Sequence, residues 1–365
     1  MFLFRALRII KDALLAPSLP LSTRFRLLLL QPISILTYTI EWSRGRRFPH
    51  SHEIQIPLRR APGYTLRALV YLPPTPQPGK RPLHLNIHGG GFLGGLPEGN
   101  ARFCYRLAQA SGAVVISTSY RYAPVHTFPD AHEDVQDVAE YLVQHARKMF
   151  DADPVCFTVS GFSAGGNLAL GVAQGLAGAN LTTETGAEVR VRGSVTFYGV
   201  LDLRLPPWEK PTPEGFPKAD PLFFLQPLMD AYAGPNRVRD IDNPLIHPTL
   251  ADIKSLPQNM LFVAGDKDIL YAETVAMVGR LGEEAMHANR GNGLVWSRSE
   301  DDQRPDGKRV VVKMEVLKGQ IHGWLELPSA VIDVKIRDKV FKDAISFLKG
   351  VHQAYGFECE GTDVN

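Results

Sequence analysis

"VSGFSAGGNLALG", residues 159–171, places Ser163 between two glycines where an apolar run gives way to a helical pattern. The residues before the serine are typical of a buried strand, and the small residues after it are typical of a helix. A G-x-S-x-G pentapeptide at a strand-to-helix turn holds its serine in a strained, accessible conformation. The flanking glycines avoid the collision that a Cβ would cause at such a turn. We therefore predict that Ser163 is a nucleophile and not merely a hydroxyl in a glycine-rich loop.

A run of glycines, "HGGGF" at residues 88–92, follows the apolar stretch "LHLNI". Consecutive glycines allow backbone N–H groups to point at a substrate oxygen, and such preorganised donors stabilise a tetrahedral transition state. No Lys-Ser/Thr pair follows the run, which excludes a P-loop. We expect the amides of Gly90, Gly91 and Ala164 to form an oxyanion hole, and His88 to support the loop.

A general base and an acid are expected at the ends of two later strands. "VLKGQIHGWLELP" places His322 between a strand and the final helix, and a serine needs such a base to react at neutral pH. "FVAGDKDILYAE" offers Asp266 and Asp268 at the end of another strand. We favour Asp268 as the acid that orients the imidazole, with Asp266 as the alternative, and one of the two is expected to cap the following helix.

The order of elements predicts an α/β fold. Strand-like segments alternate with helical ones, among them helices over 130–150, 271–285 and 330–350. Two segments of alternating polarity within 52–74 lead into this pattern and are expected to be antiparallel strands. Alternation of this kind predicts a mostly parallel central sheet with helices on both faces.

The chain is expected to divide into cap helices at 1–50 and a catalytic domain at 51–365. A stretch rich in proline and aromatic residues, about 203–256, interrupts the alternation and is interpreted as a cap insertion that folds over the sheet. Its aromatic residues are candidate walls of a substrate pocket, although packing within the cap is favoured for most of them. They are Trp208, Phe216, Phe223, Phe224 and Tyr232.

The N-terminal segment combines apolar and basic residues. Charged residues interrupt the apolar stretch in 1–18 and no small-x-small cleavage site follows, so a signal peptide and secretion are not expected, and a cytoplasmic location is favoured. Its spacing predicts a basic amphipathic helix. The apolar segment 27–40 carries Gln31 and Pro32 and is shorter than the roughly 20 apolar residues that a membrane span needs. We favour a lid that packs on the domain, and peripheral membrane contact remains the alternative.

Composition restricts the choice of partner. The chain has 365 residues and a net charge of +2 with both signs mixed along it, which argues against a nucleic-acid partner. Its three cysteines form no C-x-x-C pair, so neither a disulfide framework nor a structural zinc site is expected. No metal or organic cofactor is predicted, and the sequence gives no indication of the oligomeric state.

Four blocks together resemble the hormone-sensitive-lipase branch of the α/β-hydrolase family, over roughly residues 50–350. The resemblance implies the α/β-hydrolase fold and hydrolysis of carboxylic esters through an acyl-enzyme, with Ser163, Asp268 and His322 as a catalytic triad. The chain departs from the family in having Phe162 where an acidic residue usually precedes the nucleophile. The four blocks are "HGGGF" (88–92), "SYRYAPVHTFPDAHED" (119–134), "GFSAGGNLA" (161–169) and "GDKDIL" with "IHGW" (265–270 and 321–324).

A serine esterase acting on small to medium lipophilic esters is the leading hypothesis. An amide or lactone hydrolase would use the same acyl-transfer steps, so the triad does not separate these reactions. A non-catalytic small-molecule receptor on the same scaffold, as in the plant gibberellin receptor, is a third reading. That receptor type lacks the catalytic histidine, and the presence of His322 argues against this reading.

Overall fold

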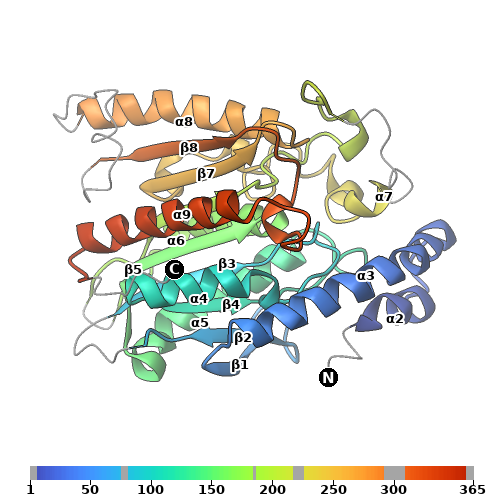
Figure 1. Ribbon diagram of the computed structural model, residues 1–365, viewed down its shortest axis with the longest axis horizontal. Helices are drawn as coiled ribbons and strands as arrows, with labels where there is room; N and C mark the ends of the chain where they lie inside the picture. Colours follow the sequence, from blue (N-terminus) through green and yellow to red (C-terminus); the bar gives the residue numbers. More distant parts are fainter. Residues whose placement is uncertain (1–5, 75–80, 184–185, 217–225, 292–308, 359–365) are drawn as a thin grey trace.

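An eight-stranded sheet runs through the computed structural model, which describes residues 6–74, 81–183, 186–216, 226–291 and 309–358 (Figure 1). The strand order is β1-β2-β4-β3-β5-β6-β7-β8. The strands are β1 (His52–Pro57), β2 (Thr65–Tyr71), β3 (Arg81–Ile87), β4 (Val114–Thr118), β5 (Ala152–Phe162), β6 (Val191–Phe197), β7 (Asn259–Gly265) and β8 (Val311–Leu317).

The direction of the strands agrees with the sequence pattern. β2 pairs antiparallel with both β1 and β4, and every other neighbouring pair in the sheet is parallel. The central strands β4, β5, β6 and β7 are almost entirely buried, as strands covered by helices on both faces must be. The predicted mostly parallel sheet is therefore confirmed.

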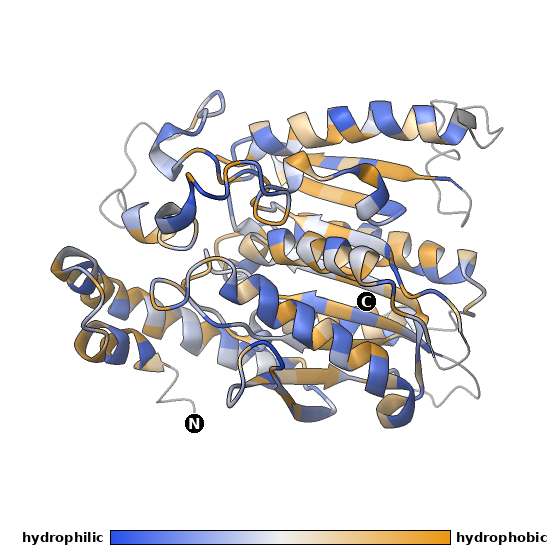
Figure 2. Cartoon of the chain, turned by 180° about the vertical axis from the view of Figure 1, so that it is seen from behind, coloured by the Kyte–Doolittle hydropathy of each residue, from blue (hydrophilic) through white to orange (hydrophobic). Residues whose placement is uncertain are grey.

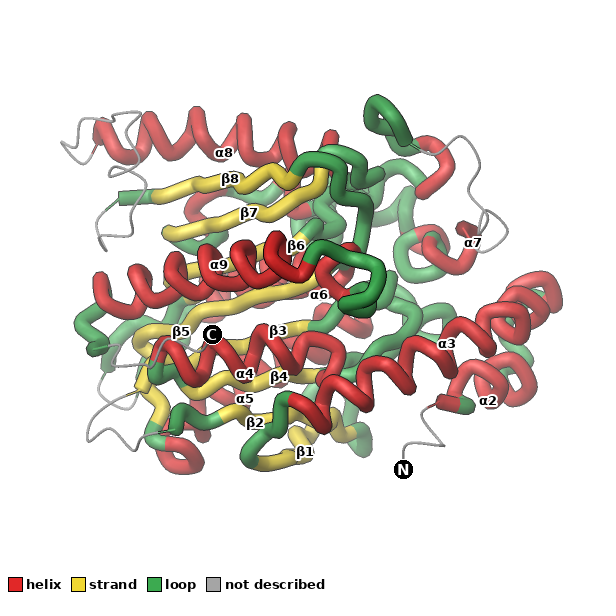
Figure 3. The backbone as a smooth tube through the Cα atoms, in the orientation of Figure 1, coloured by secondary structure: helices red, strands yellow, loops and turns green. Residues whose placement is uncertain are grey.

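Helices cover both faces of the sheet (Figure 3). α4 and α9 pack against one face, where they share an apolar core with alternate residues of β6 and β7. α5 and α6 pack together on the opposite face, and α8 lies over β7 and β8. The helices of the body are α4 (Ala101–Ser111), α5 (Asp130–Phe150), α6 (Ala164–Ala179), α8 (Tyr271–Gly291) and α9 (Val334–Ala354).

The helix boundaries agree with the sequence expectation in one case and differ in another. α5 matches the predicted span of 130–150, because Asp130 and Glu133 in the first turn favour the positive end of the helix dipole. α6 begins at Ala164, so the helix starts directly after the candidate nucleophile. The last helix, α9, begins at Val334 and not near residue 330.

Two helices, α2 (Arg8–Leu15) and α3 (Leu21–Arg47), form a hairpin that extends from one end of the body (Figure 1). The apolar segment 27–40 is the middle of α3, which continues through Pro32 to a length of 27 residues. Within the described ranges, no helix combines the length and the apolar character that crossing a bilayer would require. The first five residues lie outside the described part of the chain.

The segment 203–256 contains no strand in its described parts, 203–216 and 226–256, and folds into short 3₁₀ turns and the one-turn helix α7 (Gln226–Met229). Tyr232 is buried and stacks on Phe92 with the ring centroids 4.1 Å apart. Phe223 and Phe224, two of the candidate pocket aromatics, lie outside the described residues.

The block 119–134 braces the body beside the candidate nucleophile. The backbone N–H of Arg121 donates to Asp134 at 2.7 Å, and its Nε donates to the same carboxylate at 2.8 Å. Asp134 is 1% exposed, and the guanidinium offsets part of the cost of burying its charge. The pair therefore ties the loop after β4 to α5.

Candidate active site

Ser163 occupies the turn between β5 and α6 in a backbone conformation that side chains rarely adopt. Its φ of 52° and ψ of −118° carry a strain of about 1–3 kcal/mol. Three backbone hydrogen bonds hold the turn: the Ser163 N–H donates to Phe197 O at 2.9 Å, and the Ser163 carbonyl accepts from Gly166 at 2.9 Å and from Val200 at 3.2 Å. The surroundings therefore impose the conformation on the serine.

The glycines on either side of Ser163 are required by close approach. A Cβ on Gly161 would collide with the carbonyl of Gly165, and a Cβ on Gly165 would collide with the carbonyl oxygen of Ile87. The second contact brings α6 against the end of β3, where the glycine run 88–92 begins. Packing thus places the start of α6 beside that run.

An imidazole lies between Ser163 and a carboxylate. His322 Nε2 is 2.8 Å from Ser163 Oγ, and His322 Nδ1 is 2.9 Å from Asp268 Oδ2. Asp268 is 1% exposed. With its proton on Nδ1, the imidazole donates to Asp268 and accepts from the Ser163 hydroxyl.

The pKa of His322 reflects two opposing effects. Burial by itself lowers the pKa, but the negative charge and hydrogen bond of Asp268 outweigh it, so the pKa of His322 is raised above its usual value. The imidazolium form is therefore stabilised where a proton from Ser163 would arrive. The arrangement suits a general base that must hold a positive charge briefly.

The two candidate acids have different places. Asp268 reaches His322 and also accepts from the Leu270 N–H at 2.8 Å, just before α8. Asp266 instead accepts from the Gly319 N–H at 2.6 Å, across the turn that follows β8. Asp268 therefore contacts the imidazole, whereas Asp266 stabilises the loop between β8 and His322.

The glycine run lies next to Ser163 in a conformation that only glycine adopts easily. Gly90 has φ 108° and Gly91 has φ 60°, and a Cβ on Gly90 would collide with the carbonyl of Gly94. A Cβ built on Gly89 would lie 3.4 Å from Ser163 Cβ. Among the described residues, the N–H groups of Gly90, Gly91 and Ala164 donate to no other protein group. They are therefore free to bind a substrate oxygen.

His88 supports the glycine run from below. Its Nδ1 lies 2.7 Å from Gly89 O, its Nε2 lies 3.2 Å from the Tyr122 hydroxyl, and its ring stacks on Tyr120 at 4.7 Å. Burial lowers the pKa of His88 to about 4, so the ring is neutral near pH 7. It has hydrogen-bond partners on both ring nitrogens.

Glu326 is a buried acid near the site that sequence reasoning missed. Its carboxyl accepts from the Tyr198 hydroxyl at 3.3 Å and from the Asn100 amide at 3.3 Å. Burial raises its pKa. The Tyr198 ring in turn contacts the His322 ring edge-on at 5.2 Å. Phe162 occupies the position where the family usually has an acidic residue, and it packs into the apolar core. Its presence was the one signal in the sequence that another segment supplies the acid.

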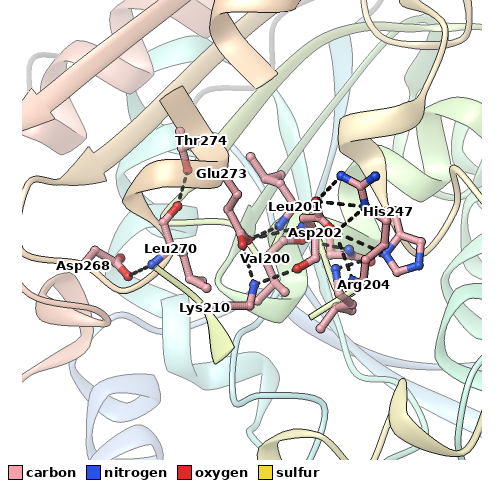
Figure 4. A network of polar contacts seen from close by, with 12 residues as sticks. Val200, Leu201, Asp202, Arg204, Lys210, His247, Asp268, Leu270, Glu273 and Thr274 are labelled. Atoms are coloured by element: carbon pink, nitrogen blue, oxygen red, sulfur yellow. Dashed lines mark hydrogen bonds and ion pairs between the residues drawn. The ribbon is translucent and has the colours of Figure 1, made fainter. Parts of the chain in front are cut away.

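A second missed group, Glu273, ties the candidate cap insertion to α8 (Figure 4). It accepts from the backbone N–H of Leu201 at 2.7 Å and of Asp202 at 3.3 Å, and it forms an ion pair with Lys210. Lys210 also donates to the Asp202 carbonyl at 2.7 Å. Asp268 accepts a hydrogen bond just before the start of α8, and Glu273 lies in the first turn of that helix. The insertion and the candidate acid are therefore both attached to the start of α8.

Metal chemistry has no candidate ligands here: the part of the chain that the structure describes contains no cluster of three or more His, Cys, Asp or Glu side chains placed to hold an ion. The groups available near Ser163 are an imidazole, a carboxylate and backbone amides. Such groups can transfer protons and stabilise an oxyanion.

The close approach at Gly165 predicts a large difference between two identical substitutions in α6. Gly165→Ala should lower the free energy of unfolding by at least about 1–3 kcal/mol, because its Cβ meets backbone that cannot move aside. Gly178→Ala, where nothing lies within 4 Å of the added Cβ, should raise it by about 0.5–1 kcal/mol. Urea unfolding of the two variants measures both effects, and equal midpoints would contradict the geometry of the turn.

Comparison with known proteins agrees with this arrangement. A family model described as alpha/beta hydrolase fold matches residues 84–290. Esterase LipI of Mycobacterium tuberculosis is 29% identical over 220 residues, covering 58% of this chain and 65% of LipI. Ethyl acetate hydrolase of Pseudomonas putida is 37% identical over 116 residues, covering 32% of this chain and 36% of that protein. The chain thus matches less than two thirds of the length of either relative.

The fold extends further than the sequence matches. The structure of a hyperthermophilic esterase from Pyrobaculum calidifontis superimposes with a TM-score of 0.61 at 26% identity, covering 86% of this chain and 90% of that one. The matched family segment contains the glycine run, Ser163 and Asp268, and the superposition extends over most of the remaining chain. The chain therefore belongs to the alpha/beta hydrolase fold family, in its hormone-sensitive-lipase-like branch.

Proposed function

We propose that this chain is a serine carboxylesterase that hydrolyses esters of small to medium lipophilic acids. The observation that carries the proposal is the unbroken chain of hydrogen bonds from Ser163 through His322 to Asp268, beside three unengaged amides. Two sequence relatives are named for ester hydrolysis, which supports the same reaction type. A receptor that only binds its ligand has no need of an imidazole 2.8 Å from a serine hydroxyl.

In the proposed reaction, Ser163 Oγ attacks the ester carbonyl carbon while its proton moves to His322 Nε2. The carbonyl oxygen becomes an oxyanion, which the amides of Gly90, Gly91 and Ala164 stabilise. The imidazolium then gives the proton to the departing alcohol, leaving an acyl-serine. Water repeats the sequence with His322 as base and releases the acid, while Asp268 stabilises the imidazolium in both halves.

The surroundings of the glycine run favour apolar substrates. Phe92 stacks on Tyr232. A Cβ built on Gly91 would lie 3.0 Å from the sulfur of Met229. Met229 ends the short helix of the insertion and is exposed, so it supplies apolar surface beside the proposed oxyanion hole. Tyr232 is buried behind it. We therefore propose small-molecule esters with apolar acyl groups as substrates.

The acid of the proposed triad can be tested with a matched pair of variants. Wild-type protein should release p-nitrophenol from short p-nitrophenyl esters. Asp268→Asn should lower kcat by about 10⁴-fold, because the imidazole loses its orienting carboxylate. Without that negative charge the pKa of His322 should fall, so the acidic limb of kcat/KM should move to lower pH.

Asp266→Asn is the control, since it removes a carboxylate of the same loop that does not touch the imidazole. This variant should keep the wild-type position of the acidic limb. A larger decrease in kcat for Asp266→Asn than for Asp268→Asn would contradict the assignment of Asp268 as the acid of the triad. No hydrolysis by wild-type protein across acyl lengths would contradict the proposed function itself.

The proposal also concerns contact with a membrane, because α3 exposes many apolar side chains and buries several polar ones. Of the 24 large apolar side chains exposed in the described residues, 11 lie between Leu7 and Trp42. Exposed apolar side chains are therefore concentrated on this hairpin. Figure 2 shows hydrophobic residues recurring along both of its helices. The buried side of α3 is mixed: it contains Leu27 and Leu30, but also Gln31, Ser34, Tyr38 and Glu41.

Charge in the hairpin favours an anionic lipid surface as the neighbour of this apolar face. Residues 6–48 contain seven Lys or Arg and only two acids, Asp12 and Glu41. Asp12 pairs with Arg8, and Glu41 is buried. An apolar face bordered by cations binds the interface of anionic bilayers by burial and by electrostatic attraction. We therefore propose peripheral membrane contact through the α2–α3 hairpin.

Contacts between the hairpin and the glycine loop connect this surface to the site. Arg8 donates to the carbonyl of Leu93, and the Tyr38 hydroxyl lies 2.9 Å from where a Cβ on Gly94 would be. The loop that follows the glycine run therefore rests on both helices. A lipophilic ester in the bilayer would reach the enzyme at the end that carries the proposed site.

Vesicle binding tests the membrane contact. Wild-type protein should cosediment with phosphatidylglycerol-containing vesicles, and a double variant Phe25→Ser, Leu36→Ser should lose most of this binding, because both side chains are 62% exposed on α3. Val238→Ser, at a residue 91% exposed elsewhere, should bind like wild type. A wild-type protein that ignores these vesicles, or a double variant that still binds them, would contradict the contact.

A further inference from the structure

A cavity lies behind the nucleophile turn. It has a volume of about 330 Å³ and is lined by the C-terminal end of α3, the start of α4, the segment 325–330 and the start of α9. Ser163, Asp268 and His322 do not line it, and Phe162 forms part of its wall. Its lining combines aromatic rings with cations. The rings are Phe48, Phe103, Phe162 and Phe341, and the cations are Arg44, Arg47, Arg102 and Arg337.

Arg337 is the unusual member of this lining. Its exposure is 4%, and the hydrogen bond it makes with a side chain is from Nη2 to Ser329 Oγ at 3.0 Å. Its buried Nε has no partner, and within the described ranges no carboxylate forms an ion pair with it. Burial and the positive charge of Arg102 lower the pKa of Arg337 to about 10, so the guanidinium stays charged at neutral pH. A buried cation without an ion-pair partner is costly.

The charged residues around Arg337 form their hydrogen bonds with other groups. Arg44 donates to the backbone carbonyls of Gly99 and Glu326. Arg102 shares a single carboxylate oxygen of Asp338 with Arg106, at 3.2 and 2.8 Å. One carboxylate therefore serves two arginines. Its negative charge raises the pKa of Arg337 without outweighing burial, and no ion pair between the two is found in the described residues.

Glu326 is the acidic residue that lines the cavity, and its carboxyl already binds Asn100 and Tyr198. Burial raises its pKa above the usual value. The cavity consequently has an excess of positive charge on one wall and apolar rings on the others. A ligand that fits must be anionic at one end and apolar elsewhere.

We infer that this cavity is a binding site for a small organic carboxylate, separate from the site of hydrolysis. The carboxylate would pair with the guanidinium of Arg337, whose planar fork matches a carboxylate in two parallel hydrogen bonds. The rings of Phe103 and Phe341 would contact the apolar body of the ligand. The inference does not depend on hydrolysis, although the acids released by the proposed reaction belong to this chemical class.

Calorimetry with benzoate tests the site. Wild-type protein should bind benzoate saturably, and benzamide, the neutral analogue, should bind at least about tenfold more weakly, because a charge-assisted hydrogen bond contributes about 1.5–3 kcal/mol. Arg337→Gln should weaken benzoate binding by a similar factor. Arg280→Gln, which removes a half-exposed arginine from α8, should bind benzoate like wild type. Equal affinity of Arg337→Gln and wild type would overturn the inference.

Two further measurements separate this site from the active site and from a purely structural role. In crystals soaked with 4-bromobenzoate, the anomalous peak of bromine should lie among Arg337, Phe103 and Phe341. A peak beside Ser163 alone would overturn the inference. Without ligand, Arg337→Gln should unfold at a urea midpoint no lower than wild type, because it removes a buried charge that has no ion-pair partner. A guanidinium that only supports the fold would make the variant less stable.

Discussion

The hydrogen bond between Ser163 and His322 is the interaction on which the proposed chemistry depends, and the parallel half of the sheet makes it available. Ser163 follows β5, Asp268 follows β7, and His322 follows β8, so all three lie beyond the carboxyl ends of parallel strands. Residues separated by more than 50 positions in the chain therefore meet at one edge of the sheet. The glycine run follows β3 at that same edge, which places backbone amides beside the serine.

The strained turn at Ser163 is held by rigid surroundings on every side. Backbone hydrogen bonds tie it to β6, and glycines allow α6 to approach β3 closely. Beneath the turn, Phe162 stacks on Phe197 at 4.3 Å within an apolar core. A strain of about 1–3 kcal/mol is thus spread over contacts that also form the body of the protein. Phe162 also lines the cavity beside Arg337, so the proposed carboxylate site is adjacent to the turn.

Local features were predictable from the sequence, and distant pairings were not. The strand, turn and helix around Ser163 follow from local pattern, and α5 begins where Asp130 indicates. The order of the strands depends on crossovers between distant segments, which hydrophobic pattern does not encode. The partners of Glu326, and the absence of an ion-pair partner for Arg337 among the described residues, likewise depend on side chains from other elements. α3 was difficult because periodicity analysis assumes that the buried side of a helix is its apolar side.

Labelling with a fluorophosphonate tests the central claim most directly, because this reagent phosphonylates a serine only when a neighbouring base removes its proton and an oxyanion hole holds the product. Intact-mass and peptide analysis of the folded protein should show one adduct, on Ser163, and none in Ser163→Ala. The rate of labelling should fall sharply in His322→Ala. A folded wild-type protein that stays unlabelled, or that carries the adduct on another residue, would contradict the account.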